Sequence, residues 1–310
     1  MKSKGNTTNP APGGTAMLGG RPVARIGFGA MQLPGPGVWG PPRNRDQALA
    51  VLRRAVAMGV NHIDTAAFYG KAVSNELIRT ALYPYPDKLV LVSKVGAVRD
   101  EKAAWLPAQQ PEQLRSAVED NLRSLAVECI DVVNLRVMDR HPDGTPFPAS
   151  QRADFHAQLR AMEAMREEGK IGAIGLSNVT LDHLQLAQSV GIACVQNAYS
   201  VLDRSGEPLL AFCEEHHMAW VPFFPLGSAF PGRAKVTQHP VVVQTATRLK
   251  ATPAQVGLAW LLAHSDAILL IPGTAHPDHL AENVAAGAVQ LDVEAISRLD
   301  GLAAKTAQAT

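Results

Sequence analysis

The chain has 310 residues, of which 46% are hydrophobic and 18% charged, which is typical of a globular protein and excludes a fibrous or fully disordered one. Its 29 lysines and arginines nearly balance 28 aspartates and glutamates, so charge gives no reason to expect nucleic acid or an anionic membrane as partner. No apolar run reaches the length needed to span a membrane.

The first residues predict a tail rather than a folded element. Residues 1–16 are rich in Gly, Pro, Asn and Thr and lack the apolar core of a secretory signal. The cysteines Cys129, Cys194 and Cys213 form no CxxC motif, which suits a reducing cytosol and small buried apolar roles. We therefore expect a cytoplasmic protein with a flexible tail over residues 1–16 and one folded domain over residues 17–310.

After residue 16, short apolar segments rich in strand-forming residues alternate with segments of helical periodicity. Gly59, Pro84 and Gly169 stand where predicted helices end, as helix-terminating residues do. The expected strands are 25–31, 61–65, 88–94, 129–135, 170–177, 193–197, 219–224 and 267–273. The expected helices are 44–58, 75–82, 111–125, 155–168, 181–190, 208–217, 241–250, 253–264, 276–286 and 293–302.

Eight strand-then-helix units with mostly apolar strands predict a parallel sheet covered by helices. We expect this α/β chain to close into a (β/α)8 TIM barrel within a single domain. An open, doubly wound sheet is the alternative, although Gln32 stands where the third glycine of its G-x-G-x-x-G motif belongs.

The active site of such a barrel lies at the carboxyl ends of its strands, so polar residues there are the candidates. Asp64, Lys94 and Arg136 follow or end predicted strands, and Tyr69 lies in the loop after Asp64. A cation lowers the pKa of a phenol from about 10, so Lys94, held by Asp64, would make Tyr69 a general acid toward a carbonyl oxygen. The competing interpretation is a structural Asp64–Lys94 ion pair beside a packed tyrosine ring. His62 precedes Asp64 by two residues and is expected in the barrel interior.

Several segments resemble the aldo-keto reductase family, in the same order along the chain. GVNHIDTAAFYG and LVSKVG are similar to the segments that carry the family's catalytic Asp, Tyr and Lys. GLSNV, VQNAYS, VPFFPLG and IPGTAHPDHLAEN are similar to its cofactor-binding segments. The resemblance runs from about residue 17 to 302 and implies a nicotinamide-dependent carbonyl reductase with Asp64, Tyr69 and Lys94 as catalytic residues.

The resemblance also implies which residues bind the cofactor. Ser177, Asn178 and Gln196 would hold the nicotinamide carboxamide, and Phe223 would stack on the ring in place of the more common tyrosine. The family's preference makes NADPH (as NADP+ in the reverse direction) the expected cofactor. NADH stays open, because no Lys or Arg stands in the phosphate-binding segment. The other implied cofactor residues are Gly29, Ala30, Met31, Asp64, Pro225, Leu226, Gly227, Ile271, Gly273, Thr274, His279, Glu282 and Asn283.

Arg136 stands where the family usually ends its fourth strand in histidine. Because arginine stays protonated and offers a planar fork of donors, we expect it to point at the substrate oxygen rather than pair with Asp139. GAMQLPGPGVWGPPRNRD and the strand of Arg136 resemble the bacterial pyridoxal reductase branch of the family, which implies reduction of pyridoxal to pyridoxine. Trp39 and Trp105, expected in loops after the first and third strands, would wall the substrate pocket with Tyr69 and Arg136.

Other functions stay open on the sequence. A reductase of other aromatic or aliphatic carbonyls would keep the mechanism and change the pocket loops. A lyase with a Schiff base on Lys94 needs a neutral amine, which Asp64 opposes. A non-catalytic nicotinamide-binding redox sensor would keep the same residues without turnover. We expect a small-molecule carbonyl substrate, no metal because no HExxH or similar cluster occurs, and a monomer or small homo-oligomer.

Overall fold

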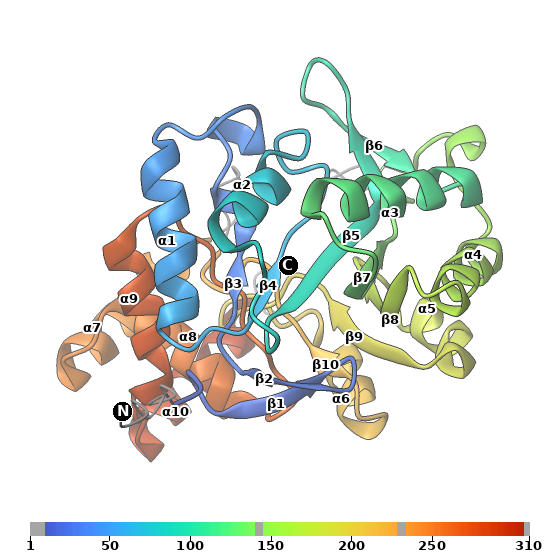
Figure 1. The fold of residues 1–310 in the computed structure, drawn as a ribbon. Helices are drawn as coiled ribbons and strands as arrows, with labels where there is room; N and C mark the ends of the chain where they lie inside the picture. Colours follow the sequence, from blue (N-terminus) through green and yellow to red (C-terminus); the bar gives the residue numbers. More distant parts are fainter. Residues whose placement is uncertain (1–9, 140–144, 228–233, 307–310) are drawn as a thin grey trace.

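Parallel strands form a curved sheet at the centre of the molecule, and helices lie around its outer face (Figure 1). The computed structural model describes residues 10–139, 145–227 and 234–306. The strands of this sheet, in the order in which they pair, are β3 (Phe28–Gly29), β4 (His62–Asp64), β5 (Val90–Arg99), β7 (Ile130–Arg136), β8 (Ile171–Ser177), β9 (Ile192–Gln196) and β10 (Ala219–Trp220).

Each predicted helix is present, with ends that differ by a few residues. The α-helices are α1 (Arg45–Ala57), α2 (Val73–Leu82), α3 (Pro111–Leu125), α4 (Phe155–Glu167), α5 (Leu181–Leu186), α6 (Glu207–Glu215), α7 (Pro240–Leu249), α8 (Pro253–His264), α9 (Pro277–Ala285) and α10 (Val293–Thr306). Short 3-10 helices are η1 (Ala30–Gln32), η2 (Pro36–Val38), η3 (Ala149–Gln151), η4 (Gln188–Val190), η5 (Val236–Gln238) and η6 (Ala286–Ala288). The predicted helix 181–190 is thus divided into α5 and η4.

The helix ends follow from local sequence. The side chain of Asn44 accepts a hydrogen bond from the backbone N–H of Gln47 and so caps α1. Thr252 and Gln255 cap α8 reciprocally, and Pro253 occupies its first turn, where a missing N–H costs nothing. Apolar side chains such as Leu52 on α1 then pack against the sheet. These helices cover the outer face of the barrel.

The sheet closes on itself between β10 and β3 through the segment predicted as the eighth strand. Leu269 donates its backbone N–H to Trp220 O at 2.8 Å, and Leu270 donates to Arg25 O at 2.7 Å. The pairing is parallel on both sides but limited to bridges at Ile268 and Leu270. The barrel expected from the strand-then-helix repeat is therefore confirmed, and the open doubly wound alternative is wrong. The predicted strand 267–273 is longer than the paired segment.

An antiparallel hairpin that the prediction missed lies across the amino end of the barrel, at the bottom of Figure 1. It consists of β1 (Thr15–Leu18) and β2 (Arg21–Ala24), joined by Gly19 and Gly20, both with positive φ. Leu18 and Val23 are buried against side chains at the start of the barrel strands. The expected tail boundary at residue 16 falls inside β1, because burial of Leu18 orders this strand. Residues 1–9 of the expected tail lie outside the described residues.

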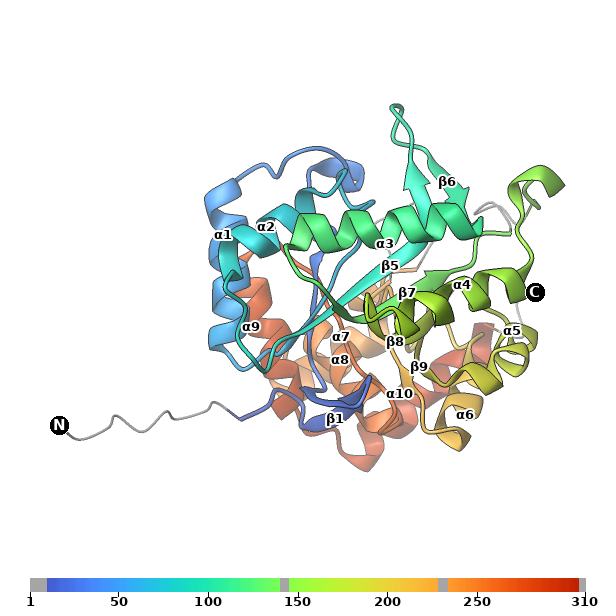
Figure 2. The same ribbon diagram turned by 45° about the vertical axis from the view of Figure 1, so that its right-hand side comes forward.

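A second hairpin rises from the opposite, carboxyl end of the barrel (Figure 2). β5 continues beyond its pairing with β7 and pairs antiparallel with β6 (Trp105–Ala108) from Gly96 onward. Trp105, expected in a loop, is therefore in a strand opposite Arg99. This hairpin extends the wall of the barrel above its carboxyl end.

His62 lies in the barrel interior, as its spacing from Asp64 predicts. It is 1% exposed, and a Cβ on Gly27 would lie 2.1 Å from its ring, so glycine at that position makes room for the imidazole. Burial lowers the pKa of His62 to about 4, and the backbone of Ala24 offsets part of the shift. The ring is therefore neutral at pH 7.

We expect His62 to make the protein less stable as the pH falls from 6.5 to about 4. In this interval the unfolded chain, with the ordinary pKa of 6.5, binds a proton that the folded chain does not. The difference corresponds to roughly 3 kcal/mol of unfolding free energy, fully present above pH 6.5 and lost by pH 4. Urea unfolding across this range measures it. His62→Leu should lose less stability on acidification, whereas His156→Gln, exposed on α4, should behave as the parent; an equal loss in His62→Leu would contradict the assignment.

Candidate active site

The predicted catalytic side chains lie together at the carboxyl end of the barrel. Asp64 ends β4, Arg136 ends β7, and Lys94 lies where β5 begins to leave the barrel for its hairpin. The ammonium of Lys94 lies 5.1 Å from the centre of the Tyr69 ring, and its Nζ donates to Asp64 Oδ1. Searching for polar residues at the carboxyl ends of the predicted strands thus identified residues that the fold brings into contact.

Asp64 and Lys94 form a buried ion pair with further hydrogen bonds on both sides. Lys94 Nζ also donates to Thr65 O at 3.1 Å, and Gln196 Nε2 donates to Asp64 Oδ2 at 2.7 Å. Burial alone would lower the pKa of Lys94, but Asp64 and Tyr69 raise it, and the net shift is upward. Lys94 is therefore a cation at neutral pH, which disfavours the Schiff-base lyase because that chemistry needs a neutral amine.

Tyr69 remains a phenol at neutral pH. It is 6% exposed, and this burial raises its pKa above the ordinary 10.0. Lys94 and Arg136 lower the pKa, as expected, but they do not outweigh burial and the repulsion from Asp64. The expected net lowering of the Tyr69 pKa is therefore wrong. A protonated phenol is nevertheless the form that donates a proton.

Arg136 is a half-buried cation without a carboxylate partner among the described residues. Its Nη1 donates to Ser177 Oγ at 3.3 Å, and its guanidinium carbon lies 5.6 Å from the centre of the Phe223 ring. Burial lowers the pKa of Arg136 and Tyr69 raises it, but an arginine stays charged. Arg136 does not form the alternative ion pair with Asp139. The Oδ2 atom of Asp139 instead lies 3.8 Å from Nε2 of His183. Most donors of Arg136 therefore have no partner in the described part of the chain and could bind a ligand.

A polar network that the sequence analysis missed lies between the strands that carry the ion pair and the helices α2 and α3. Thr65 donates to Asn75 Oδ1 at 2.8 Å, and Asn75 donates to Asn121 Oδ1 at 3.0 Å. Ser93 also donates to Asn121 Oδ1, at 2.5 Å. Thr65 and Ser93 are the chain neighbours of Asp64 and Lys94 and face the helices α2 and α3. The network thereby fixes the backbone of the two strands that carry Asp64 and Lys94.

Comparison with known proteins agrees with this geometry. Residues 25–304 match the sequence model of the Aldo/keto reductase family. The chain belongs to the aldo/keto reductase family. It is an oxidoreductase that acts on carbonyl or CH–OH groups.

Relatives of this aldo/keto reductase include proteins with assigned activities. Pyridoxine 4-dehydrogenase of Escherichia coli (strain K12) is 48% identical over 289 residues, which cover 93% of this chain and 98% of that protein. NADH-specific methylglyoxal reductase of the same strain is 26% identical over 300 residues, covering 85% and 90%. An aldo/keto reductase from Klebsiella pneumoniae, solved with NADP and acetate, has a TM-score of 0.75 at 28% identity and covers 93% of this chain and 94% of its own.

The residues expected to bind the nicotinamide lie on neighbouring strand ends of this aldo/keto reductase. Ser177 ends β8, Gln196 ends β9, and Asn178 donates its backbone N–H to Gln196 O at 2.9 Å. The Oε1 atom of Gln196 is buried and has no hydrogen-bond partner among the described residues. An acceptor left unpaired in this way fits an amide N–H donor, such as that of a carboxamide. Phe223 is half-buried and faces Arg136.

The other expected cofactor residues form two further groups at the same end. Gly29 and Gly273 cross closely, because a Cβ on either would lie 2.4 Å from a carbonyl oxygen of the other segment. The helix α9 begins just beyond, and His276 before it makes no side-chain cap, so the first N–H groups of α9 are left for an anion. The remaining residues lie beside these groups: Ala30 and Met31 at η1, Pro225, Leu226 and Gly227 after β10, and Ile271, Thr274, His279, Glu282 and Asn283 along the segment into α9.

Aromatic rings line the carboxyl end beside Tyr69. The rings of Phe68 and Tyr69 are 5.3 Å apart, and those of Phe68 and Trp105 are 5.4 Å apart. Trp39 is not in direct ring contact with these side chains in the described chain; it reaches Trp105 through Arg99, whose guanidinium lies near both indoles. Trp39 and Trp105, the two residues predicted to line the substrate pocket, therefore both lie at the carboxyl end of the barrel.

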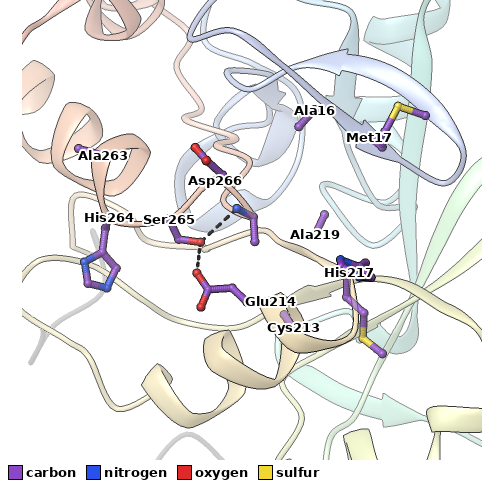
Figure 3. Close-up of a pocket in the computed structure, with 12 residues that line it drawn as sticks. Ala16, Met17, Cys213, Glu214, His217, Ala219, Ala263, His264, Ser265 and Asp266 are labelled. Atoms are coloured by element: carbon purple, nitrogen blue, oxygen red, sulfur yellow. Dashed lines mark hydrogen bonds between the residues drawn. The ribbon is translucent and has the colours of Figure 1, made fainter.

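A hollow of about 600 Å³ lies at the other end of the barrel and contains none of the predicted site residues. Figure 3 shows Ser265 donating to Glu214, a hydrogen bond of 2.5 Å, and Ala16 and Met17 of β1 line the same hollow. Apart from Ala16 and Met17 of β1, its lining residues lie before or at the start of β10 or before the segment that closes the barrel, so it lies at the amino ends of the strands. This hollow and Lys94 therefore lie at opposite ends of the barrel.

Other expectations can be compared with the described residues. Cys194 and Cys213 are buried as predicted, but Cys129 is exposed, so its predicted burial is wrong. No group of three or more His, Cys, Asp or Glu side chains in the described part of the chain could hold a metal ion. None of its described helices is both long and apolar enough to cross a membrane.

Proposed function

We propose that this chain is an NADPH-dependent carbonyl reductase whose substrate is pyridoxal, reduced to pyridoxine. The observation that supports this substrate is the position of Arg136, which is half-buried beside Tyr69 and has no carboxylate partner among the described residues. Because even partial burial of a charge without a counter-ion is unfavourable, this position favours a substrate with an electron-rich oxygen, such as the phenolic oxygen of pyridoxal. The 48% identity with a pyridoxine 4-dehydrogenase supports the same substrate.

The proton chemistry follows from the contacts of Tyr69. When bound, the nicotinamide supplies the hydride that reduces the carbonyl carbon. Tyr69 donates its proton to the carbonyl oxygen, which becomes the oxygen of the alcohol. Lys94 stabilises the phenolate that remains, and Asp64 keeps Lys94 charged and in place. Arg136 donates to a substrate oxygen and stabilises negative charge as it develops.

The strand ends and the start of α9 offer groups that fit each part of a nicotinamide cofactor. Gln196, Ser177 and Asn178 would hold the carboxamide, Phe223 would stack on the ring, and the start of α9 would receive phosphate. The Klebsiella pneumoniae structure with NADP supports NADPH, whereas the NADH-specific relative keeps NADH as the second candidate. A cytoplasmic location, the absence of a nucleic-acid partner and a monomeric or small homo-oligomeric state stay predictions.

The test follows NADPH absorbance with pyridoxal and with nitrobenzaldehyde in the parent enzyme and in Arg136→Met. We expect pyridoxal to have the higher kcat/KM in the parent. Arg136→Met should lower that kcat/KM by roughly 10- to 100-fold, which corresponds to a hydrogen bond with a charged donor. Nitrobenzaldehyde lacks the phenolic oxygen and should be affected less. Arg248→Met, at an exposed ion pair with Asp292, is the matched control.

The alternatives give different results in the same assay. Turnover of nitrobenzaldehyde alone would replace pyridoxal by another aldehyde and keep the reductase. Tight NADPH binding without turnover of either carbonyl would favour the redox sensor. Higher kcat/KM with NADH than with NADPH would overturn the cofactor proposal.

A further inference from the structure

Arg99, at the end of β5, lies between the two tryptophans of the barrel mouth. Its guanidinium carbon is 5.2 Å from the centre of the Trp39 ring and 4.3 Å from that of Trp105. Its Nε donates to Ala103 O at 2.9 Å, within the β5–β6 hairpin. Unlike Arg136, Arg99 therefore has protein partners over its planar surface and along its edge, and it is not available to bind a ligand.

The other donors of Arg99 hold a strained loop. Nη1 donates to Val38 O at 3.2 Å, and Nη2 donates to Gly37 O at 3.1 Å. Val38 has a φ of 59°, a left-handed conformation that a β-branched residue rarely adopts unless its surroundings enforce it. The backbone N–H of Gly70 also donates to Val38 O, at 3.1 Å. The carbonyl of Val38 thus connects the loop before Trp39 to Arg99 and to the residue after Tyr69.

A series of contacts extends from Arg99 to the proposed proton donor. Trp105 lies opposite Arg99 in the β5–β6 hairpin. The Trp105 ring meets Phe68 edge-on, and Phe68 meets Tyr69 edge-on. A displacement of Arg99 would therefore remove its guanidinium from the Trp39 ring, over which the Lys71 ammonium also lies at 5.2 Å, and from the Trp105 ring, which packs on Phe68 beside Tyr69.

We propose that Arg99 is a positioning residue that fixes Trp39 and Trp105 as the two walls of the substrate pocket and so sets its preference for flat aromatic carbonyls. This inference rests on the proposed function, because the pocket is the one assigned there to the substrate. Lysine can keep the charge over the indoles, but it lacks the planar fork that binds Val38, Gly37 and Ala103 together. Arg99→Lys should therefore lie between the parent and Arg99→Met in every measurement below.

One measurement tests the positioning role without turnover. The chain has four tryptophans, and Trp220 and Trp260 are 0% and 1% exposed, so acrylamide quenching of fluorescence reports mainly on Trp39 and Trp105. We expect a clear rise in the quenching constant of Arg99→Met. Arg115→Met, which removes an exposed ion pair with Glu168, should leave the constant unchanged. An unchanged constant in Arg99→Met would overturn the positioning role.

A second measurement tests the effect on substrate choice. In Arg99→Met, KM for pyridoxal should rise about tenfold because the aromatic walls are displaced, while kcat changes less. The kcat/KM for propionaldehyde, too small to need both walls, should stay near the parent value. Increased quenching with unchanged selectivity would overturn the specificity role and keep the positioning role. A parent enzyme that reduces no carbonyl would overturn the proposed function and the specificity role with it, while quenching would still decide the positioning role.

Discussion

Replacing Tyr69 with phenylalanine should lower kcat for carbonyl reduction by about 10²- to 10⁴-fold, the range for a general acid. The ring stays in place beside Phe68, and only the proton and the hydrogen bond to substrate are lost. The dissociation constant of NADPH, measured by fluorescence titration, should change little. Stopped-flow measurement of a single turnover separates this loss from product release.

The control for Tyr69→Phe is another tyrosine on the same chain. Tyr83 is 60% exposed and lies after α2, so Tyr83→Phe should keep full activity. Because burial raises the pKa of Tyr69, the parent should reduce carbonyls at a level rate up to the ordinary tyrosine value of 10.0 and lose rate only above it. If Tyr69→Phe were as fast as the parent, another group would have to donate the proton.

The parts of this fold that the sequence predicts well are those set by short-range periodicity. Apolar runs and helix-ending residues place the strands and helices to within a few residues. The length of the last strand depends on pairing instead: Pro272 has no N–H to donate, and only Ile268 and Leu270 form bridges. The β1–β2 hairpin had a turn signal in Gly19 and Gly20, but the composition of the preceding tail obscured it.

The same division holds for the site. Asp64, Lys94 and Arg136 are predictable because parallel strands bring their carboxyl ends to one edge. The pKa shift of Tyr69 is not predictable from the sequence, because the direction of the shift depends on burial as well as on the charge of Lys94. The role of Arg99 is also hidden in the sequence, since its acceptors come from a loop about sixty residues earlier and from the next turn. Long-range contacts of this kind appear only in the folded chain.

Removing one partner of the Asp64–Lys94 pair should destabilise the protein strongly, and removing both should separate structure from catalysis. Lys94→Met leaves the Asp64 carboxylate buried and unpaired, and Asp64→Asn leaves the Lys94 ammonium in the same state. Each should cost about 3–5 kcal/mol of unfolding free energy, measured in urea. Arg115→Met, at an exposed pair, should cost less than about 1 kcal/mol.

The double variant Asp64→Asn/Lys94→Met should recover much of that stability, because neither charge is then left alone in the interior. If the pair is catalytic, the double variant folds but remains slower than the parent by about 10² or more in kcat, since no cation stabilises the phenolate of Tyr69. If the pair were only structural, activity would return together with stability. Gln196, which donates to Asp64 Oδ2 at 2.7 Å, can keep that hydrogen bond to the Oδ1 of asparagine. A loss of rate in the double variant therefore reports on the missing charges rather than on a collapsed site.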